Sequence, residues 1–187
     1  MEDSTPSLTF LFRKASQKDV PQIAELYRKC FAPWIDGPSA PQYMSNMIAD
    51  SSYQVIAAED KPGHLAGFII ANCTFAQLYE VANIDVMAVD PACRRSGLGK
   101  ALMHMGEMSA RNAGAKALTL QVVENNEPAK NLYLSLGFNI VTKRQKYYRD
   151  GTNAYEMQKV LPPPAANDDL AHPAVQRPKR RRGIFYE

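Results

Sequence analysis

Hydrophobic residues recur with two spacings between residues 8 and 161, and together these predict a mixed α/β domain. Runs rich in β-branched and aromatic residues predict strands, whereas recurrence at i, i+3 and i+4 predicts helices. The predicted strands are Leu8–Arg13, Tyr53–Glu59, His64–Asn72, Leu78–Val89, Ala117–Val123, Phe138–Tyr148 and Ala154–Leu161. The predicted helices are one that follows Ser16, Gln42–Ala49, Gly97–Ala113 and Pro128–Leu136. This order predicts one sheet with helices around it.

Residues typical of caps and turns separate these segments. Ser16 resembles a helix N-cap, with Asp19 at the capping-box position. Asp60–Gly63 is a hairpin turn by composition, and Phe31–Pro41 is a proline-containing loop. After Leu161 the composition changes to proline and then to basic residues. We therefore expect a domain over residues 1–161 and a disordered tail over residues 162–187.

The composition excludes several classes of protein. The chain has 187 residues, 45% of them hydrophobic and 22% charged, as in ordinary globular domains. Three scattered cysteines exclude a disulfide framework and fit a reducing compartment, and no apolar stretch is long enough to cross a membrane. His64, His104 and His172 lack metal-ligand spacing, and a net charge of +3 is too small to indicate nucleic acid. We expect a cytoplasmic protein that binds no metal and no membrane.

The segment Arg94–Lys100 carries the strongest chemical signal. A strand ends before it, two arginines and two glycines follow, and a helix begins at once. Glycines let the backbone approach a ligand closely, and the first N–H groups of a helix attract anions. A Walker loop is excluded, because Arg94 and Ala101 stand where it needs glycine and Ser or Thr. A Rossmann fingerprint would need a glycine at Leu102. The sequence therefore predicts a different phosphate-binding loop.

The segment Arg94-Arg95-Ser96-Gly97-Leu98-Gly99 resembles the Q/R-x-x-G-x-G/A signature of the GNAT acetyltransferases. Residues 126–138, NEPAKNLYLSLGF, resemble a second signature of that family. The resemblance implies a GNAT fold, with a mixed, mostly antiparallel sheet of about seven strands and about four helices. It also implies an acetyl-CoA-dependent acetyltransferase that needs no metal. The residues implied in binding acetyl-CoA are Met87, Ala88, Val89, Arg94, Arg95, Ser96, Gly97, Leu98, Gly99, Lys100 and Asn126.

Within the family, the chain resembles RimI-type enzymes, which acetylate the amino terminus of a ribosomal protein. The likeness rests on residues 31–34 (FAPW), on residues 88–91 (AVDP), and on residues 144–148 (RQKYY) in the predicted sixth strand. It implies that Tyr147 and Tyr148 contact the substrate, and adjacent strand residues such as these would face opposite sides. Trp34 either lines the substrate groove or caps the core. The chain departs from the pattern at Gln121, because RimI-type enzymes carry a catalytic glutamate there.

Acetyl transfer to an amine needs a proton donor for the thiolate and a neutral amine. The matching motif makes Tyr133 the candidate acid. Asp85 is the first candidate for the base, and regular alternation would place it on the same side as Met87 and Val89. Glu80, Glu124 or a water relay are alternatives. An α-amine has a pKa of ~7.7–8.0, against ~10.4 for lysine, so a weak base suffices for an N-terminal substrate.

We therefore expect an N-acetyltransferase that acts on a protein or peptide α-amine. Alternatives are acetylation of a small amine such as a polyamine or aminoglycoside, acetylation of lysine, and an acyl-CoA sensor without turnover. The basic run Arg177–Arg182 suggests contact with RNA or ribosomes. The sequence leaves open whether the protein is a monomer or a homodimer.

Overall fold

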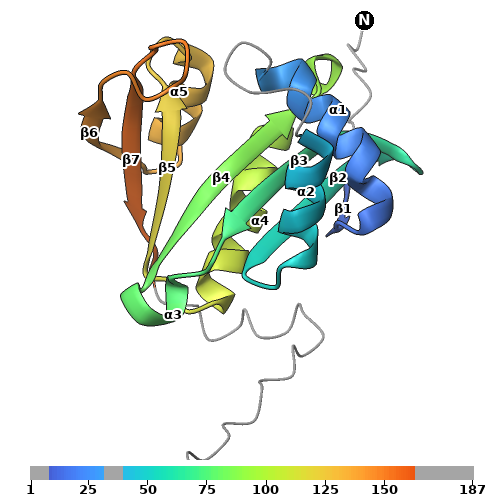
Figure 1. Cartoon of the computed structure of the whole chain (residues 1–187), viewed down its shortest axis with the longest axis horizontal. Coiled ribbons are helices and arrows are strands. Elements are labelled where there is room, and N and C mark those ends of the chain that lie inside the picture. Colours follow the sequence, from blue (N-terminus) through green and yellow to red (C-terminus); the bar gives the residue numbers. More distant parts are fainter. Residues whose placement is uncertain (1–8, 32–39, 163–187) are drawn as a thin grey trace, which may run out of the picture.

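The computed structural model describes residues 9–31 and 40–162. They form one seven-stranded sheet with helices on its two faces (Figure 1). The strands are β1 (Leu11–Lys14), β2 (Tyr53–Lys61), β3 (His64–Asn72), β4 (Val81–Val89), β5 (Ala117–Val123), β6 (Asn139–Arg144) and β7 (Ala154–Val160). The α-helices are α1 (Val20–Phe31), α2 (Ala40–Ala49), α3 (Ala76–Tyr79), α4 (Leu98–Asn112) and α5 (Glu127–Ser135). Trp34 and the basic run 177–182 lie outside the described residues.

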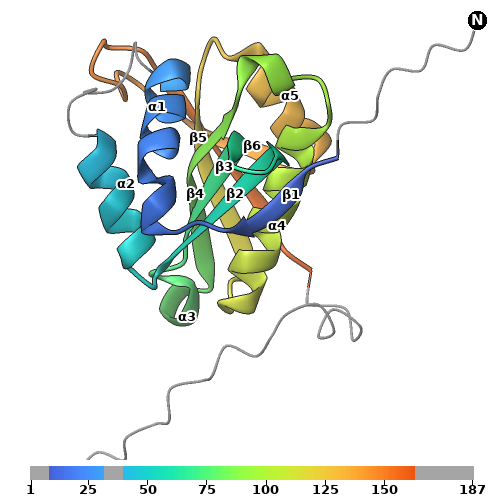
Figure 2. The same cartoon turned by 90° about the vertical axis from the view of Figure 1, so that its right-hand side faces the viewer.

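The strand order is β1-β2-β3-β4-β5-β7-β6, and every neighbouring pair except β4–β5 is antiparallel. This confirms the predicted mixed, mostly antiparallel sheet. α1 and α2 pack on one face, with a core that includes Ile23, Met44 and Phe68. α4 and α5 lie on the other face, with a core that includes Leu102, Leu118 and Tyr133 (Figure 2).

The parallel pair β4–β5 stays together only at its start. The register joins Val81–Ile84 to Ala117–Leu120 and goes no further. β4 continues to Val89 and β5 to Val123, and Figure 1 shows the two strands moving apart. β4 therefore has an edge over residues 85–89 that β5 does not cover.

A β-bulge lies where the two strands begin to separate. Ile70 of β3 pairs with Val86 but Ala71 pairs with Ile84, so Asp85 is an extra residue on β4. The bulge reverses the alternation, because Ile84 belongs to the core under α4 and Val86 to the core under α1 and α2. We expected Asp85 to share a side with Met87 and Val89. That expectation is wrong, because an extra residue shifts the pleat by one.

Two predicted strands are shorter in the structure. The segment predicted as Leu78–Val89 begins with the helical turn α3, which ends at Glu80 in the left-handed conformation (φ 57°). The segment predicted as Phe138–Tyr148 ends at Arg144, and Lys146 has φ 49° in the turn that follows. Tyr147 and Tyr148 therefore lie in a loop, so strand alternation does not decide which way they face.

No helix of the described residues is long and apolar enough to cross a membrane.

Candidate active site

Side-chain hydrogen bonds and one ion pair fix the shape of the loop between β4 and α4. Asp90 accepts a hydrogen bond from the Ala92 N–H (2.8 Å) and pairs with Lys29 of α1 (2.8 Å). Ser96 Oγ donates to the Cys93 carbonyl (2.6 Å). These bonds fix the turn Pro91–Cys93 and bring the chain back to the start of α4, while Arg94 and Arg95 remain exposed.

The start of α4 has free backbone donors. The Ala101 N–H donates to the Gly97 carbonyl (3.1 Å) and makes the first helical bond, so the N–H groups of residues 98–100 have no acceptor within the helix. Gly97 has φ 85°, a conformation that glycine adopts without strain. A Cβ on Gly99 would lie 3.3 Å from Leu132 Cδ2 and 3.9 Å from Val89 Cγ2. The loop therefore presents donors and little bulk, which fits a phosphate group.

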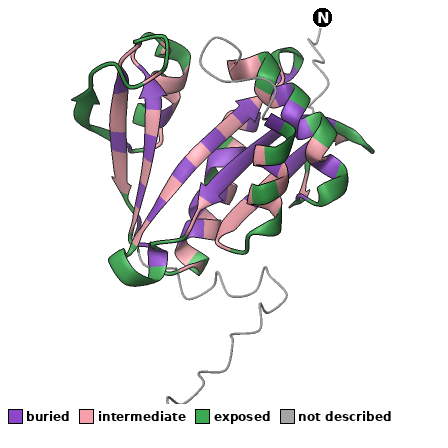
Figure 3. Ribbon diagram, viewed as in Figure 1, coloured by how far each residue is buried: buried purple, intermediate pink, exposed green. Residues whose placement is uncertain are grey.

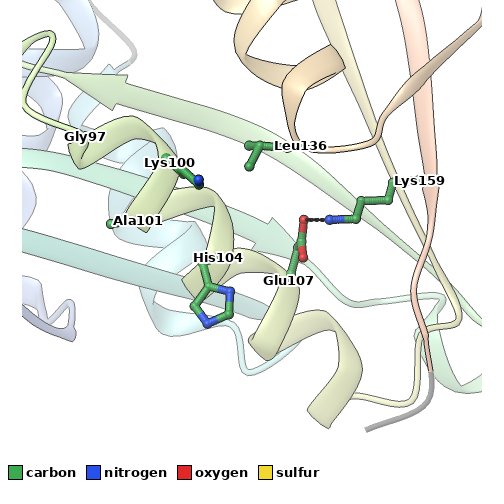
Figure 4. Close-up of a pocket in the computed structure, with 7 residues that line it drawn as sticks. All are labelled: Gly97, Lys100, Ala101, His104, Glu107, Leu136 and Lys159. Atoms are coloured by element: carbon green, nitrogen blue, oxygen red, sulfur yellow. Dashed lines mark hydrogen bonds and ion pairs between the residues drawn. The ribbon is translucent and has the colours of Figure 1, made fainter. Parts of the chain in front are cut away.

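A cavity of about 440 Å³ adjoins this loop (Figure 4). Lys159 of β7 reaches across it and forms an ion pair with Glu107, a buried carboxylate of α4. Its lining residues are Gly97, Lys100, Ala101, His104, Glu107, Leu136 and Lys159. Because Lys159 is already paired, Lys100 is the cation that this cavity offers to an anion.

The predicted residues of β4 divide between the two faces of the sheet. Met87 and Val89 pack under α4 near Gly99, with the Met87 Cε 4.0 Å from the position of a Cβ there. Ala88 is buried on the other side, under α1 and α2. Met87 and Val89 therefore lie beside the loop, whereas a role for Ala88 in binding would fall to its backbone.

Tyr133 is held inside the packing of α5. Asn126 caps this helix, with its side-chain oxygen accepting from the Ala129 N–H (3.2 Å). The Tyr133 ring packs against Phe138 at a centroid distance of 6.0 Å, and only 8% of the residue is exposed. Burial raises the pKa of the Tyr133 phenol, and Tyr148 raises it further. The phenol is thus a protonated group in the neutral pH range.

Tyr148 lies close enough to Tyr133 to raise its pKa electrostatically. Tyr147 and Tyr148 pack edge to face, with centroids 5.1 Å apart. Tyr147 is exposed, whereas burial raises the pKa of the half-buried Tyr148 to about 12. The structure therefore brings one of the two predicted substrate residues to the candidate acid.

Asp85 belongs to a different cluster, on the α2 side of the sheet. Asn83 Nδ2 donates to Asp85 Oδ1 (2.6 Å), and Asn72 Nδ2 donates to Asp85 Oδ2 (3.3 Å). Burial raises the pKa of the Asp85 carboxyl, although the two amides oppose the shift. The charge of Asp85 in turn contributes to the raised pKa of Tyr43 and Tyr53.

The other candidate bases are less suited to this role. Glu124 pairs with Lys143 and accepts from Asn153 Nδ2 (2.7 Å), and these partners lower the pKa of its carboxyl. Glu80 pairs with Lys116 (2.6 Å) at the opposite end of β4 from the loop. Gln121 is paired in register with Glu156 of β7, on the half of the sheet beyond the separation.

Sequence reasoning missed the amides Asn72 and Asn83, which hold Asp85, and the hydroxyl of Thr119, which donates to Asn83 Oδ1 (2.9 Å). The bulge that gathers them leaves no mark in the hydrophobic pattern. The polar residues Asn83 and Asp85 within an otherwise apolar strand were the available signal. Among the described residues, no three His, Cys, Asp or Glu side chains are grouped as metal ligands.

Residues 20–138 match the Acetyltransferase (GNAT) family. The chain therefore belongs to this family, and it is an acetyltransferase by membership. Members of the family transfer the acetyl group of acetyl-CoA.

A relative from Bacillus subtilis (strain 168), which bears the provisional name [ribosomal protein bS18]-alanine N-acetyltransferase, is 29% identical over 139 residues, 74% of this chain and 86% of the relative. The crystal structure of the ribosomal-protein-S18-alanine N-acetyltransferase from Escherichia coli is similar with a TM-score of 0.67 and 27% identity, over 85% of this chain and 98% of that one. YncA of Salmonella typhimurium, solved with its cofactor acetyl-CoA, shares the fold, with a TM-score of 0.69 and 21% identity over 86% of this chain and 98% of that one. Three further relatives are matched over only 43%, 59% and 55% of their own length.

Proposed function

We propose that this acetyltransferase modifies the α-amine of a protein or peptide. Tyr148 carries the proposal, because this residue of the R-x-x-Y-Y segment is near enough to Tyr133, the candidate proton donor, to raise the pKa of its phenol. The similarity to ribosomal-protein-alanine acetyltransferases supports the same substrate class. Three cysteines without disulfides support a reducing compartment, the cytoplasm.

In this proposal, the pyrophosphate of acetyl-CoA binds at the start of α4. The free N–H groups of residues 98–100 and the positive end of the helix dipole would hold it. Arg94 and Arg95, in the same loop, would add positive charge. Lys100 borders the adjacent cavity and would meet the negative charge of the nucleotide. Acetyl-CoA supplies the activated acetyl group, and the residues of this chain orient it and move protons.

The two proton transfers fall to groups on opposite sides of the separation between β4 and β5. Tyr133 would donate to the departing sulfur, because burial keeps its phenol protonated. Asp85 would accept the proton of the amine, because its raised pKa makes it a better base than an ordinary aspartate. An α-amine with a pKa of ~7.7–8.0 is already partly neutral near pH 7. The glutamine at position 121 is then compatible with turnover.

A matched pair of peptides tests the substrate class. Each peptide contains one internal lysine, and one of the pair has a blocked amino terminus. We expect acetyl transfer to the free α-amine, located by mass spectrometry, and no transfer to the blocked peptide. Transfer to the lysine, or to polyamines or aminoglycosides while free termini are ignored, would contradict the proposal.

Tyr148→Ala tests the residue that carries the proposal. We expect the KM for the peptide to rise about tenfold, since an aromatic contact is lost, with the KM for acetyl-CoA unchanged. Val141→Ala is the matched control, because Val141 is exposed on the preceding strand β6. Equal peptide kinetics for Tyr148→Ala and Val141→Ala would remove Tyr148 from substrate binding.

A further inference from the structure

A second cavity, of about 520 Å³, lies at the other end of the β4–β5 pair from the acetyl-CoA loop. Asp85 opens onto it from the bulge, and Thr119 lines it from β5. Phe75 and Tyr79 lie at its rim, with 56% and 69% of their surfaces exposed. Its lining residues are Asn72, Phe75, Tyr79, Val81, Ala82, Asn83, Asp85 and Thr119.

The charge in this cavity is uncompensated. Asp85 is the only ionisable acid or base among the described lining residues apart from the phenol of Tyr79. Its nearest described partners, Asn72 and Asn83, are neutral amides that donate at 3.3 and 2.6 Å. Asp85 is half-buried, and removing a carboxylate from water without a cation is costly, so a cationic ligand would be stabilised there.

Hydrogen bonds from hydroxyl groups hold both amides in place, and a neutral amide cannot supply the positive charge of such a ligand. Asn83 Oδ1 accepts from Thr119 Oγ1 (2.9 Å), and Asn72 Oδ1 accepts from Thr74 Oγ1 (2.7 Å). Each amide therefore turns its N–H₂ group toward Asp85. This network spans β3, β4 and β5 and fixes the carboxylate in one orientation.

The rim favours an organic cation. The rings of Phe75 and Tyr79 lie 5.8 Å apart with an interplanar angle of 60°, so both present aromatic surface near the opening. Aromatic faces attract ammonium groups and also bury aliphatic carbon. A metal ion would need several anionic or imidazole ligands, and this cavity offers one carboxylate.

We infer that this cavity binds an organic ammonium ion with a short aliphatic body, as the entry site of the acyl acceptor on the α2 side of the sheet. This rests on the proposed function, because the ammonium would be that of the acceptor. Asp85 is the first residue of β4 that does not pair with β5. An ammonium ion held there would therefore adjoin the separation between the two strands. Burial raises the pKa of Asp85 and of its neighbours Tyr43, Tyr53 and Cys73, and the charge of Asp85 adds to the shift of these three neighbours.

Calorimetric titration of the full chain with n-butylammonium, without acetyl-CoA, tests the inference. We expect saturable binding, and binding at least ~10-fold weaker for the neutral analogue butan-1-ol, since a charged hydrogen bond is lost. Asp85→Asn should weaken n-butylammonium binding by the same factor. Glu124→Gln is the matched control, because this carboxylate lies after β5, does not line the cavity and is paired with Lys143; it should bind as the wild type does.

The rim supplies a second variant that does not depend on the network. Phe75→Ala combined with Tyr79→Ala removes exposed rings outside the proposed catalytic groups, and it should weaken n-butylammonium binding by ~3-fold or more. If Asp85→Asn does not fold, this variant decides. Absence of saturable binding by the wild type, equal binding of butan-1-ol, or full affinity in the rim variant would overturn the inference. Peptide turnover with no ammonium binding would remove the inference alone, whereas ammonium binding with no peptide turnover would remove the proposed function alone.

Discussion

The two halves of the sheet bury their strands in different ways. β2, β3 and β4 have helices on both faces, and residues 65–71 of β3 are buried without a break (Figure 3). β6, at the other end, is exposed at all six residues. The central strand β3 is therefore a continuous apolar run, as strands covered on both faces are, whereas the second half of the sheet depends on one packed face.

The chemistry is divided between these halves. The loop at α4 and the Asp85 cluster belong to the first half, and Tyr133 and Tyr148 belong to the second. Four residue pairs of β4 and β5 join the halves, and beyond them α4 meets α5 at Gly99 and Leu132. A well-packed framework thus fixes the binding elements, while the geometry across the site depends on a short junction. Substitutions in either half and at the junction should have separable effects.

The largest expected effect is in the second half. Tyr133→Phe removes the hydroxyl but keeps the ring packed against Phe138. If the phenol donates the proton, kcat should fall by roughly 10²–10⁴-fold with the KM for acetyl-CoA nearly unchanged. Tyr155→Phe is the control, because that hydroxyl donates to Glu124 (3.4 Å) and is not assigned to the reaction. A Tyr133→Phe enzyme within twofold of the wild type would leave Tyr133 with a packing role only.

A substitution where α4 meets α5 should change the affinity for acetyl-CoA. Gly99→Val adds a side chain where even a Cβ lies 3.3 Å from Leu132 Cδ2. We expect acetyl-CoA affinity to fall about 100-fold by calorimetry, because the branched side chain forces α4 and α5 apart beside the free N–H groups. Ala92→Val, at an exposed position of the preceding turn, should retain affinity. Unchanged affinity in Gly99→Val would move the binding site away from this loop.

The smallest effect should be confined to the stability of the first half. Arg13 binds Asp19 through Nη1 (2.8 Å) and Nη2 (2.7 Å), and it also binds Glu59. The Arg13 hydrogen bonds lower the pKa of Asp19 to about 2, below its unfolded value. The stabilisation is therefore complete above the unfolded pKa of ~3.9 and is lost as the pH falls toward 2.

Asp19→Asn should lower the free energy of unfolding by about 1.5–3 kcal/mol at pH 7, measured by urea denaturation. The difference from the wild type should shrink between pH 4 and pH 2, because the wild-type carboxyl becomes protonated there. Glu25→Gln, an exposed change in α1, should cost little at either pH. A cost of Asp19→Asn that did not depend on pH would contradict the assignment to ionisation.

The sequence predicted the elements best where turn residues enclose a strand. β3 and β5 have the predicted bounds His64–Asn72 and Ala117–Val123. The start of α4 was predicted at Gly97, one residue before its observed start. The errors occur where the backbone forms a turn within an apolar run that favours a strand. Leu78 and Tyr79 belong to the apolar run predicted as a strand but lie in α3, and Tyr147 and Tyr148 follow a turn at Lys146.

Features encoded in consecutive residues could therefore be predicted from the sequence alone. These are the family, the candidate phosphate-binding loop and the motif around Tyr133. The side of the sheet on which Asp85 lies was decided by the bulge, which arises from pairing with β3 and leaves no local pattern. The tertiary structure likewise decided three other features. These are the electrostatic effect of Tyr148 on Tyr133, the cavity lined by Asn72 and Thr119, and the separation of β4 from β5. Each joins residues far apart in the chain, and their mutual placement follows from strand register and packing rather than from local composition.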